Sequence, residues 1–322
     1  MFSHATLEEF QKGKITIPHK EQIWLVNNPL FYENFNFYFT KYKQKQILSV
    51  KNFGVFARGI NKIALITFNK ALDILGRLPK HNTVIFLGYK DKSFDRLNYA
   101  NNLYQEIAKK TKYNYVVVIS KGDYEFTDFY ADKTPENLKQ VFANNVNTNN
   151  NKISYYPLGR DFRSQHLFHR FPPRFKKETL CYCNFSINTH PVRKDIYQQI
   201  KDKPFINFDH MGGFRNYSIS RYDFYSKLSK SKFAICPRGY GIDTFRLWDS
   251  LYLGTIPIVV AEATFHEKLR DLPILFLDSY NDYTSLTRQF LEEKYQEMLY
   301  KKYNYKKLYL SYWINKMFSY IH

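Results

Sequence analysis

One continuous segment, residues 231–260, constrains the fold of this chain more than any other. It reads S-K-F-A-I-C-P-R-G-Y-G-I-D-T-F-R-L-W-D-S-L-Y-L-G-T-I-P-I-V-V. An apolar strand leads into a glycine-containing loop, an amphipathic helix runs from about residue 245 to Gly254, and a second apolar strand follows. Strand, helix and strand in this order are typical of a parallel α/β sheet. The segment therefore predicts an α/β fold.

The loop and the start of the helix have the chemistry of an anion site. Gly239 and Gly241 let the backbone approach a ligand closely, and Tyr240 between them belongs to the same predicted site. Thr244, or Asp243 beside it, is the predicted N-cap of the helix. The unpaired N–H groups at a helix start carry partial positive charge, which suits a phosphate group.

Two arginines and an acid extend this anion site. Arg238, in the loop, presents a planar fork of donors that matches phosphate oxygens. Arg246 lies in the first helical turn, where a cation is unfavourable unless a ligand or an acid compensates it. Asp249 lies one turn further along, so it either pairs with Arg246 within the helix or accepts hydrogen bonds from ribose hydroxyls. All three are candidate ligand-binding residues.

The second half of the chain alternates strands and helices. Strands are expected at residues 179–187, 204–208, 232–236, 255–260 and 273–277, with helices at 192–200, 222–229 and 245–253. This alternation is typical of a doubly wound parallel sheet, which binds ligands in a crevice at the carboxyl ends of its strands. Asn188, His190 and Arg193 follow the first of these strands, and His210 follows the second. These four residues join the candidate ligand-binding set.

The length of 322 residues and the proline-rich stretch 170–174 indicate two domains. In the first half, strands are expected at residues 83–87 and 115–119, and a helix followed by a loop over 134–151. The predicted domains cover residues 1–160 and 161–290, and a basic, aromatic helical tail covers residues 291–322. That tail either packs back on the body, which is the favoured interpretation, or lies on an anionic membrane surface.

A family resemblance becomes visible once these motifs are combined. The segment S-K-F-A-I-C-P-R-G-Y-G…R-L-W-D-S-L-Y-L-G-T-I-P-I-V-V resembles the signature of the exostosin-type (GT47-like) glycosyltransferases. The upstream segments Y-Y-P-L-G-R-D-F at 155–162 and P-V-R-K-D-I at 191–196 are also similar, so the resemblance covers roughly residues 154–277. The family usually carries glutamate where this chain has Asp249.

The resemblance implies a GT-B fold, in which two Rossmann-like, doubly wound domains face a cleft. The acceptor-binding domain would be residues 1–160, and the domain that binds the nucleotide-sugar donor would be residues 161–290. The residues that it implies for binding the diphosphate and the ribose or sugar are Arg193, Arg238, Gly239, Gly241, Thr244 and Asp249. Arginines and the helix start would stabilise the charge of the leaving group, so no cofactor and no metal would be required.

The expected activity is transfer of a hexosyl or pentosyl group from a nucleotide-diphosphate sugar to a hydroxyl of an oligosaccharide or other glycan, with inversion. A UDP-sugar is the favoured donor, and a GDP-sugar is the second choice. The α-1,3-fucosyltransferases share a comparable helix and a G-T-x-P-I strand, so transfer from GDP-fucose is the alternative within this class.

Inverting transfer needs a base near the acceptor hydroxyl, and the first domain is expected to supply it. Asp123, in the segment I-S-K-G-D-Y-E-F, is the first candidate and Glu125 the second. A solvated turn residue is the competing interpretation of Asp123. His190 and His210 are alternative bases on the donor side.

Charge and composition bound the partners and the compartment. The net charge of +19 favours an anionic partner, and nucleic-acid binding is the alternative of another class. Against it, the basic residues are spread along the chain without a recognised binding motif. The three cysteines lack zinc spacing, which predicts no metal site. The sequence has no apolar run of the length of a membrane span or a signal peptide, so we expect a cytoplasmic protein. A peripheral contact of the basic C-terminal tail with a membrane surface is the alternative.

Overall fold

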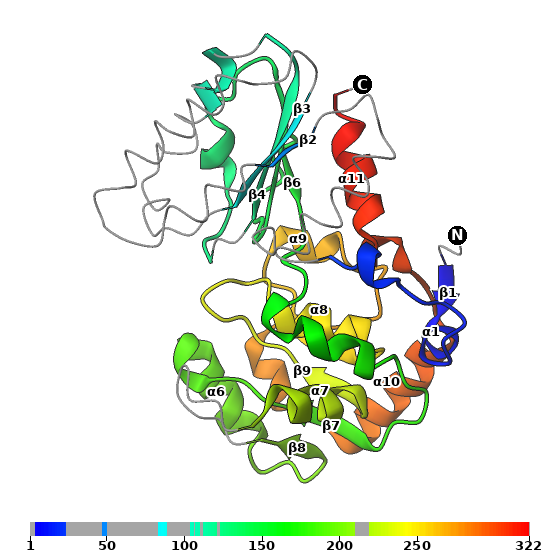
Figure 1. The fold of residues 1–322 in the computed structure, drawn as a ribbon. Coiled ribbons are helices and arrows are strands. Elements are labelled where there is room, and N and C mark those ends of the chain that lie inside the picture. Colours follow the sequence, from blue (N-terminus) through cyan, green and yellow to red (C-terminus); the bar gives the residue numbers. More distant parts are fainter. Residues whose placement is uncertain are drawn as a thin grey trace. The chain divides into compact units, whose positions relative to one another are not determined.

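The computed structural model describes residues 4–23, 47–49, 83–88, 104–105, 107–109, 112–120, 123–209 and 219–321. These residues form a mixed α/β structure with parallel sheets (Figure 1). The chain divides into two compact units. Unit 1 comprises Met1–Gln22 and Gly159–Tyr309, and unit 2 comprises Ile23–Leu158 and Leu310–His322.

Unit 1 is built on a five-stranded sheet in which every neighbouring pair of strands is parallel. The strands lie in the order β11-β10-β9-β7-β8, of which β7, β8 and β9 are labelled in Figure 1. Their bounds are β7 Thr179–Cys183, β8 Ile206–Phe208, β9 Ser231–Ile235, β10 Ile256–Val260 and β11 Leu275–Leu277. All five predicted strands are confirmed, with shifted ends. The strand order reverses between β7 and β9, and such sheets bind ligands at this switch point.

Helices connect these strands and complete the predicted alternation. α6 (Pro191–Ile200) follows β7, α7 (Arg221–Ser229) follows β8, and α8 (Phe245–Tyr252) follows β9. α9 (Thr264–Glu267) precedes β11, and the 3-10 helix η6 (Tyr280–Tyr283) follows it. Every residue of β10 is buried, because a strand covered on both faces can be apolar at each position. The sheet is therefore the core of unit 1.

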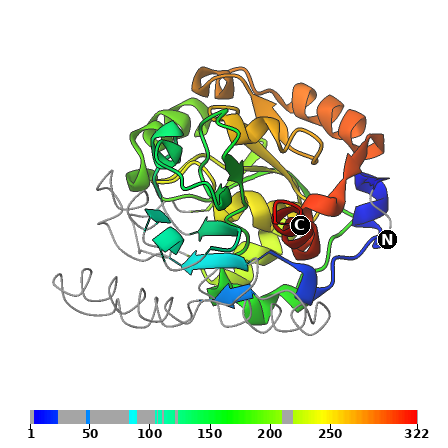
Figure 2. The same ribbon diagram turned by 90° about the horizontal axis from the view of Figure 1, so that it is seen from above.

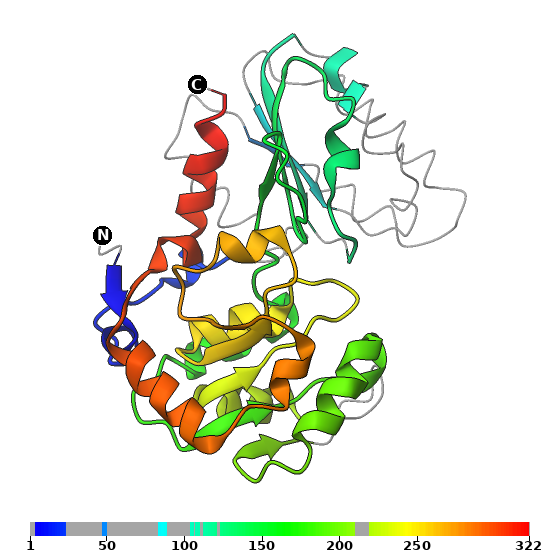
Figure 3. The ribbon, with the colours of Figure 1, turned by 180° about the vertical axis from the view of Figure 1, so that it is seen from behind.

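The first residues of the chain belong to unit 1, although the sequence placed them in a domain of residues 1–160. β1 (His4–Thr6) pairs antiparallel with β12 (Lys302–Asn304), and Phe10 stacks on Tyr305 with 4.6 Å between ring centroids. Figures 1, 2 and 3 show the blue N-terminal segment beside the orange-red segment that follows α10 from three directions. The partners lie roughly 300 positions apart, and pairing over that separation leaves no local signal in a sequence. The other elements of unit 1 are α1 (Leu7–Gln11), η1 (His19–Glu21), η4 (Phe162–Arg170), η5 (Ile187–Thr189), α10 (Arg288–Tyr300) and η7 (Tyr305–Leu308).

Helix α8 ends in a Schellman motif that requires glycine. Gly254 has a φ of +65°, and its N–H donates to the carbonyl of Leu251 at 3.2 Å. The next N–H, of Thr255, donates to the carbonyl of Ser250 at 2.9 Å. The Gly254 carbonyl accepts a hydrogen bond from Gln11 Nε2 at 2.7 Å. Gly254 therefore fixes both the end of α8 and the position of the N-terminal segment.

Replacing Gly254 with alanine is expected to lower the free energy of unfolding by about 2–3 kcal/mol. The alanine would have to keep a positive φ, and its Cβ would lie 3.0 Å from Gln11 Cγ. Gly13→Ala is the matched control, because Gly13 has a φ of +74° with open space around the added Cβ. Urea denaturation measures both losses. Equal losses would show that the crowding against Gln11 contributes nothing.

Unit 2 contains a second five-stranded parallel sheet, in the order β2-β3-β4-β5-β6. The bounds are β2 Ile47–Ser49, β3 Thr83–Gly88, β4 Tyr115–Ser120, β5 Leu138–Ala143 and β6 Ile153–Tyr155. Between β4 and β5 lies the 3-10 helix η3 (Asp128–Ala131). Among the described residues this strand order follows the chain without reversing, so the topology places a switch point only in the sheet of unit 1.

Strand β5 corrects the helix expected within residues 134–151. Residues Leu138–Ala143 pair with β4 on one side and with β6 on the other. Val141 and Phe142 are both 0% exposed. A position between two strands of a parallel sheet buries both faces, and this tertiary environment overrides the local pattern. The strands expected at 83–87 and 115–119 are confirmed as β3 and β4.

The C-terminal residues divide between the two units instead of forming one tail over residues 291–322. α10 lies in unit 1, whereas α11 (Leu310–Phe318) belongs to unit 2. Trp313 of α11 meets the rings of Tyr155 and Tyr156 edge to face, at 6.0 Å between centroids in each case. Aromatic residues of the predicted tail thus serve as core contacts. None of the helices in the described part of the chain has the length and hydropathy that a bilayer crossing requires.

Candidate functional site

The guanidinium group of Arg193 joins the loops that follow β7 and β9. Its Nε donates to the carbonyl of Arg238 at 2.6 Å, its Nη1 to that of Ser186 at 3.0 Å, and its Nη2 to that of Pro237 at 3.1 Å. The residue is 7% exposed, and burial lowers the pKa of Arg193 to about 9, so it stays protonated at neutral pH. All three acceptors are neutral carbonyls. The buried charge therefore favours an anion at this edge of the sheet.

Arg193 also explains the glycine at position 239. A Cβ on Gly239 would lie 3.2 Å from Arg193 Nη2, so a side chain there would displace the guanidinium. The Gly239 N–H donates to the carbonyl of Gly241 at 2.9 Å and closes a tight turn. The sequence assigned these residues to a diphosphate. The structure shows Arg193 holding the loop with three of its five N–H donors, which leaves two for a ligand.

Arg246 brings a second charge to the same place. The side chain of Thr244 accepts a hydrogen bond from the N–H of Leu247 at 3.4 Å, which confirms Thr244 as the N-cap and puts Arg246 in the first turn. The Nε of Arg246 is buried and has no hydrogen-bond partner in the described structure. The charge of Arg246 depresses the pKa of Arg193, second only to burial, so the two groups lie within electrostatic reach. A buried donor without a partner costs about 1–3 kcal/mol, and a ligand oxygen would supply what is missing.

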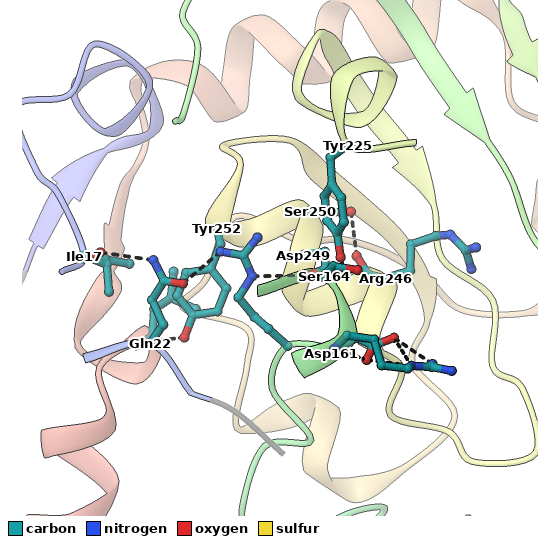
Figure 4. Close-up of polar contacts among 12 residues, drawn as sticks. Ile17, Gln22, Asp161, Ser164, Tyr225, Arg246, Asp249, Ser250 and Tyr252 are labelled. Carbon is teal, nitrogen blue, oxygen red and sulfur yellow. Dashed lines mark hydrogen bonds and ion pairs between the residues drawn. The ribbon is translucent and has the colours of Figure 1, made fainter. Parts of the chain in front are cut away.

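Asp249 does not pair with Arg246, which the sequence had allowed. Its Oδ1 accepts a hydrogen bond from Arg160 Nε at 3.1 Å, and its Oδ2 accepts one from the Tyr225 hydroxyl at 2.9 Å. Figure 4 shows Tyr225 directed at Asp249, with the Arg246 side chain extending away from it. The Asp249 side chain is 3% exposed, and burial raises its pKa to about 6 although Arg160 opposes the shift. A carboxylate enclosed in this way anchors α8, which differs from the expected contact with a ribose.

Arg160 was not recognised as part of this site from the sequence. It is 2% exposed, its guanidinium carbon lies 3.2 Å from the ring centroid of Phe168, and its Nη1 donates to Gln22 Oε1 at 2.9 Å. The local signal was an arginine, followed by Asp161, in a segment that is otherwise uncharged. That signal does not reveal a carboxylate partner that lies 89 positions further along the chain.

Arg238 forms an ion pair that the sequence did not predict. Its Nη1 lies 3.2 Å from Oε2 of Glu262, and the two side chains are 15% and 19% exposed. Glu262 comes just after β10, so the pair joins the loops that follow two adjacent strands. Tyr240 at the loop's surface is 57% exposed, whereas Gly241 is buried. An acid directly after a buried strand of a doubly wound sheet was the signal that could have identified Glu262.

His190 lies beside this pair and caps α6. Its Nδ1 accepts a hydrogen bond from the N–H of Val192 at 3.3 Å. Burial, and then the charge of Arg238, lower the pKa of His190, so the ring is neutral at pH 7. With Nδ1 as the acceptor, Nε2 carries the proton and is available as a donor. Asn188 is exposed in the preceding turn, and His210 lies outside the described residues.

The two candidate bases belong to unit 2. Asp123 is exposed, and partial loss of water around its carboxylate raises its pKa. Glu125 accepts a hydrogen bond from Asn147 Nδ2 at 3.1 Å. Both residues follow strand β4, and their catalytic roles stay predictions.

The buried residue His266, in the short helix α9, is expected to make the protein acid-sensitive. Burial lowers the pKa of His266 to about 4, and its Nδ1 accepts a hydrogen bond from the N–H of Ala263 at 3.2 Å. The unfolded chain, with a pKa near 6.5, binds the proton first as pH falls. The stability that this histidine contributes is therefore complete above pH 6.5 and decreases by about 3 kcal/mol between pH 6.5 and 4. Urea denaturation across this range should show a smaller decrease for His266→Gln, which keeps an acceptor but does not titrate. Parallel decreases would contradict this assignment.

Comparisons with known proteins add little to this geometry. No family model matches the chain, and no curated protein matches it either. Among the solved structures that match, an alpha1,3-fucosyltransferase is 12% identical, with 86% of this chain and 90% of that chain covered and a TM-score of 0.45. A likeness at this level carries no argument about this chain. The resemblance to exostosin-type enzymes stays a prediction.

Proposed function

We propose that this chain is a glycosyltransferase that binds the diphosphate of a nucleotide sugar at the switch point of unit 1. The observation that carries this proposal is the convergence of two guanidinium groups there. Arg193 is held by three carbonyls with two donors left over, and Arg246 has a buried Nε without a partner. Guanidinium forks match phosphate oxygens, and two of them suit adjacent phosphate groups.

The same arrangement suits catalysis of glycosyl transfer. When the bond between the sugar and the diphosphate breaks, negative charge develops on the leaving phosphate oxygen. Arg193 needs no reorganisation to stabilise that charge, because its position is set by the loop that it holds. The first turn of α8, capped by Thr244, adds the partial positive charge of its N–H groups. In this proposal the arginines and the start of α8 stabilise the leaving group, and a metal ion is not required.

The finer parts of the proposal concern the substrates and the base. A UDP-sugar is the favoured donor, GDP-sugars including GDP-fucose are the alternative, and the acceptor is a glycan hydroxyl. The two units would form a GT-B arrangement. Asp123 is the proposed base, with Glu125 second. Asp249, which is buried against Arg160, would hold α8 in position through this ion pair and would not contact the sugar.

Calorimetric titration with UDP, GDP, UMP and GMP tests the donor site, and a transfer assay with the matching nucleotide sugars tests the activity. We expect a nucleoside diphosphate to bind more tightly than its monophosphate and to raise the melting temperature. Absence of binding by every nucleoside diphosphate would contradict the proposal. Salt-dependent binding of nucleic acid in that situation would favour the alternative class.

A further inference from the structure

We propose that Glu262 is an internal competitor for the diphosphate: its carboxylate holds Arg238 in the empty site and gives it up to the second phosphate group. The inference rests on the proposed function, because it concerns the same anion site. The inference assigns a role to an acidic residue in a site that is otherwise basic. That role concerns the rate at which the nucleoside diphosphate product dissociates.

The main chain of Arg238 is fixed while its side chain has a choice of partners. Arg193 Nε binds the Arg238 carbonyl at 2.6 Å and Arg193 Nη2 binds the Pro237 carbonyl at 3.1 Å, so the backbone of the loop is anchored. The Arg238 side chain pairs with Glu262 at 3.2 Å and reaches the Tyr240 carbonyl at 3.4 Å. An exchange of Glu262 for a phosphate would therefore move the Arg238 side chain and leave the backbone of the loop in place.

The charges around the pair make Glu262 the acidic member of a basic group. The pKa of His190 is lowered by burial and by the charges of Arg238 and Arg193, and it is raised by the charge of Glu262. His190 therefore lies within electrostatic reach of Arg238, Glu262 and Arg193. The pair itself is mostly buried, at 15% and 19% exposure, so its attraction is screened less than that of a surface pair. Separating it is favourable only when another anion takes the place of the carboxylate.

The two phosphate positions differ in whether a carboxylate has to be displaced before the phosphate binds. A first phosphate can bind at Arg193 and Arg246, where no carboxylate has to be displaced. A second phosphate that binds through Nη1 of Arg238 has to take the place of the Glu262 carboxylate at that atom. A diphosphate thus competes with Glu262, whereas a monophosphate at the first position does not. The competition weakens the binding of a nucleoside diphosphate and speeds its release after transfer.

The test compares wild type with Glu262→Gln by calorimetry, using pyrophosphate, phosphate, UDP and UMP. Glutamine removes the charge that pairs with Arg238, so pyrophosphate and UDP should bind about five- to tenfold more tightly, with phosphate and UMP changed less than twofold. UDP dissociation, measured by stopped flow, should slow by the same factor. Glu267→Gln is the matched control: Glu267 also pairs with an arginine, Arg270, at 2.6 Å, and the same charge is removed from unit 1.

The outcomes separate this inference from the proposed function. Equal UDP affinity in wild type and Glu262→Gln overturns the inference and leaves the glycosyltransferase proposal standing. Weaker UDP binding with unchanged pyrophosphate binding also overturns it, because Glu262 would then contact the ribose. Tighter pyrophosphate binding without any binding of nucleotides supports the competitor role and contradicts the proposed function. In an Arg238→Met background, Glu262→Gln should have no effect on either ligand, and a persisting effect overturns the inference.

Discussion

Replacing Asp249 with alanine is expected to lower the free energy of unfolding by about 3–5 kcal/mol. The change removes the carboxylate that lies 3.1 Å from Arg160 Nε, while the guanidinium of Arg160 remains buried at 2% exposure. Arginine keeps its proton throughout the physiological pH range, so the buried charge that has lost Asp249 cannot be neutralised by deprotonation. Urea denaturation followed by circular dichroism measures the loss.

The reverse change supplies the control. Arg160→Met leaves Asp249 buried, but a carboxylate can take up a proton, and burial already raises the pKa of Asp249 to about 6. We therefore expect Arg160→Met to be less destabilising than Asp249→Ala. Its cost should be larger at pH 8, where the carboxylate is charged, than at pH 5, where it is protonated. Equal costs for the two variants at both pH values would show that the pair is not held by its charges.

Replacing Arg246 with methionine is expected to weaken the binding of UDP by about 10- to 150-fold, which corresponds to about 1.5–3 kcal/mol. The variant removes the guanidinium that faces the proposed phosphate position and keeps an apolar stem near the Phe224 ring, which lies 5.7 Å from that guanidinium. Without ligand, its melting temperature should be unchanged or higher, because the buried Nε that lacks a partner is removed. Calorimetry and thermal unfolding give the two readouts.

Arg270→Met is the control for Arg246→Met. Arg270 is half exposed and pairs with Glu267, and its loss changes the net charge by the same amount. We expect less than a twofold change in UDP affinity. A similar loss in both variants would mean that overall charge, and not the position of Arg246, governs binding. A lower melting temperature of ligand-free Arg246→Met would give Arg246 a structural role instead.

Local chemistry made the β9-loop-α8 part of the candidate site predictable. The β9-loop-α8 segment carries its own signals: an apolar strand, glycines in the loop, and the N-cap Thr244 before an amphipathic helix. Gly254 marked the end of α8 because a positive φ favours glycine in any context. These features depend on residues that are neighbours along the chain, so a single sequence contains them.

The partners of the charged residues could not be predicted in the same way. Asp249 had a plausible partner three positions back, in Arg246, yet it pairs with Arg160 from a segment 89 positions away. Arg238 likewise pairs with Glu262 across adjacent strands. Which of several arginines meets a given carboxylate depends on how the strands are ordered in the sheet. The helix expected within residues 134–151 was wrong for the same reason, because β5 is determined by its neighbours in the sheet.

The pairing of β1 with β12 has a consequence for the time course of folding during synthesis. His4–Thr6 cannot find its partner strand until residues 302–304 have left the ribosome. At about 5–20 residues per second, a separation of roughly 300 residues corresponds to about 15–60 s. Through that interval the apolar face of α1, including Phe10, has no Tyr305 to stack on. Residues 23–158 of unit 2 can begin to fold first, whereas unit 1 is completed only after residues 302–309 have emerged, and α11 then completes unit 2.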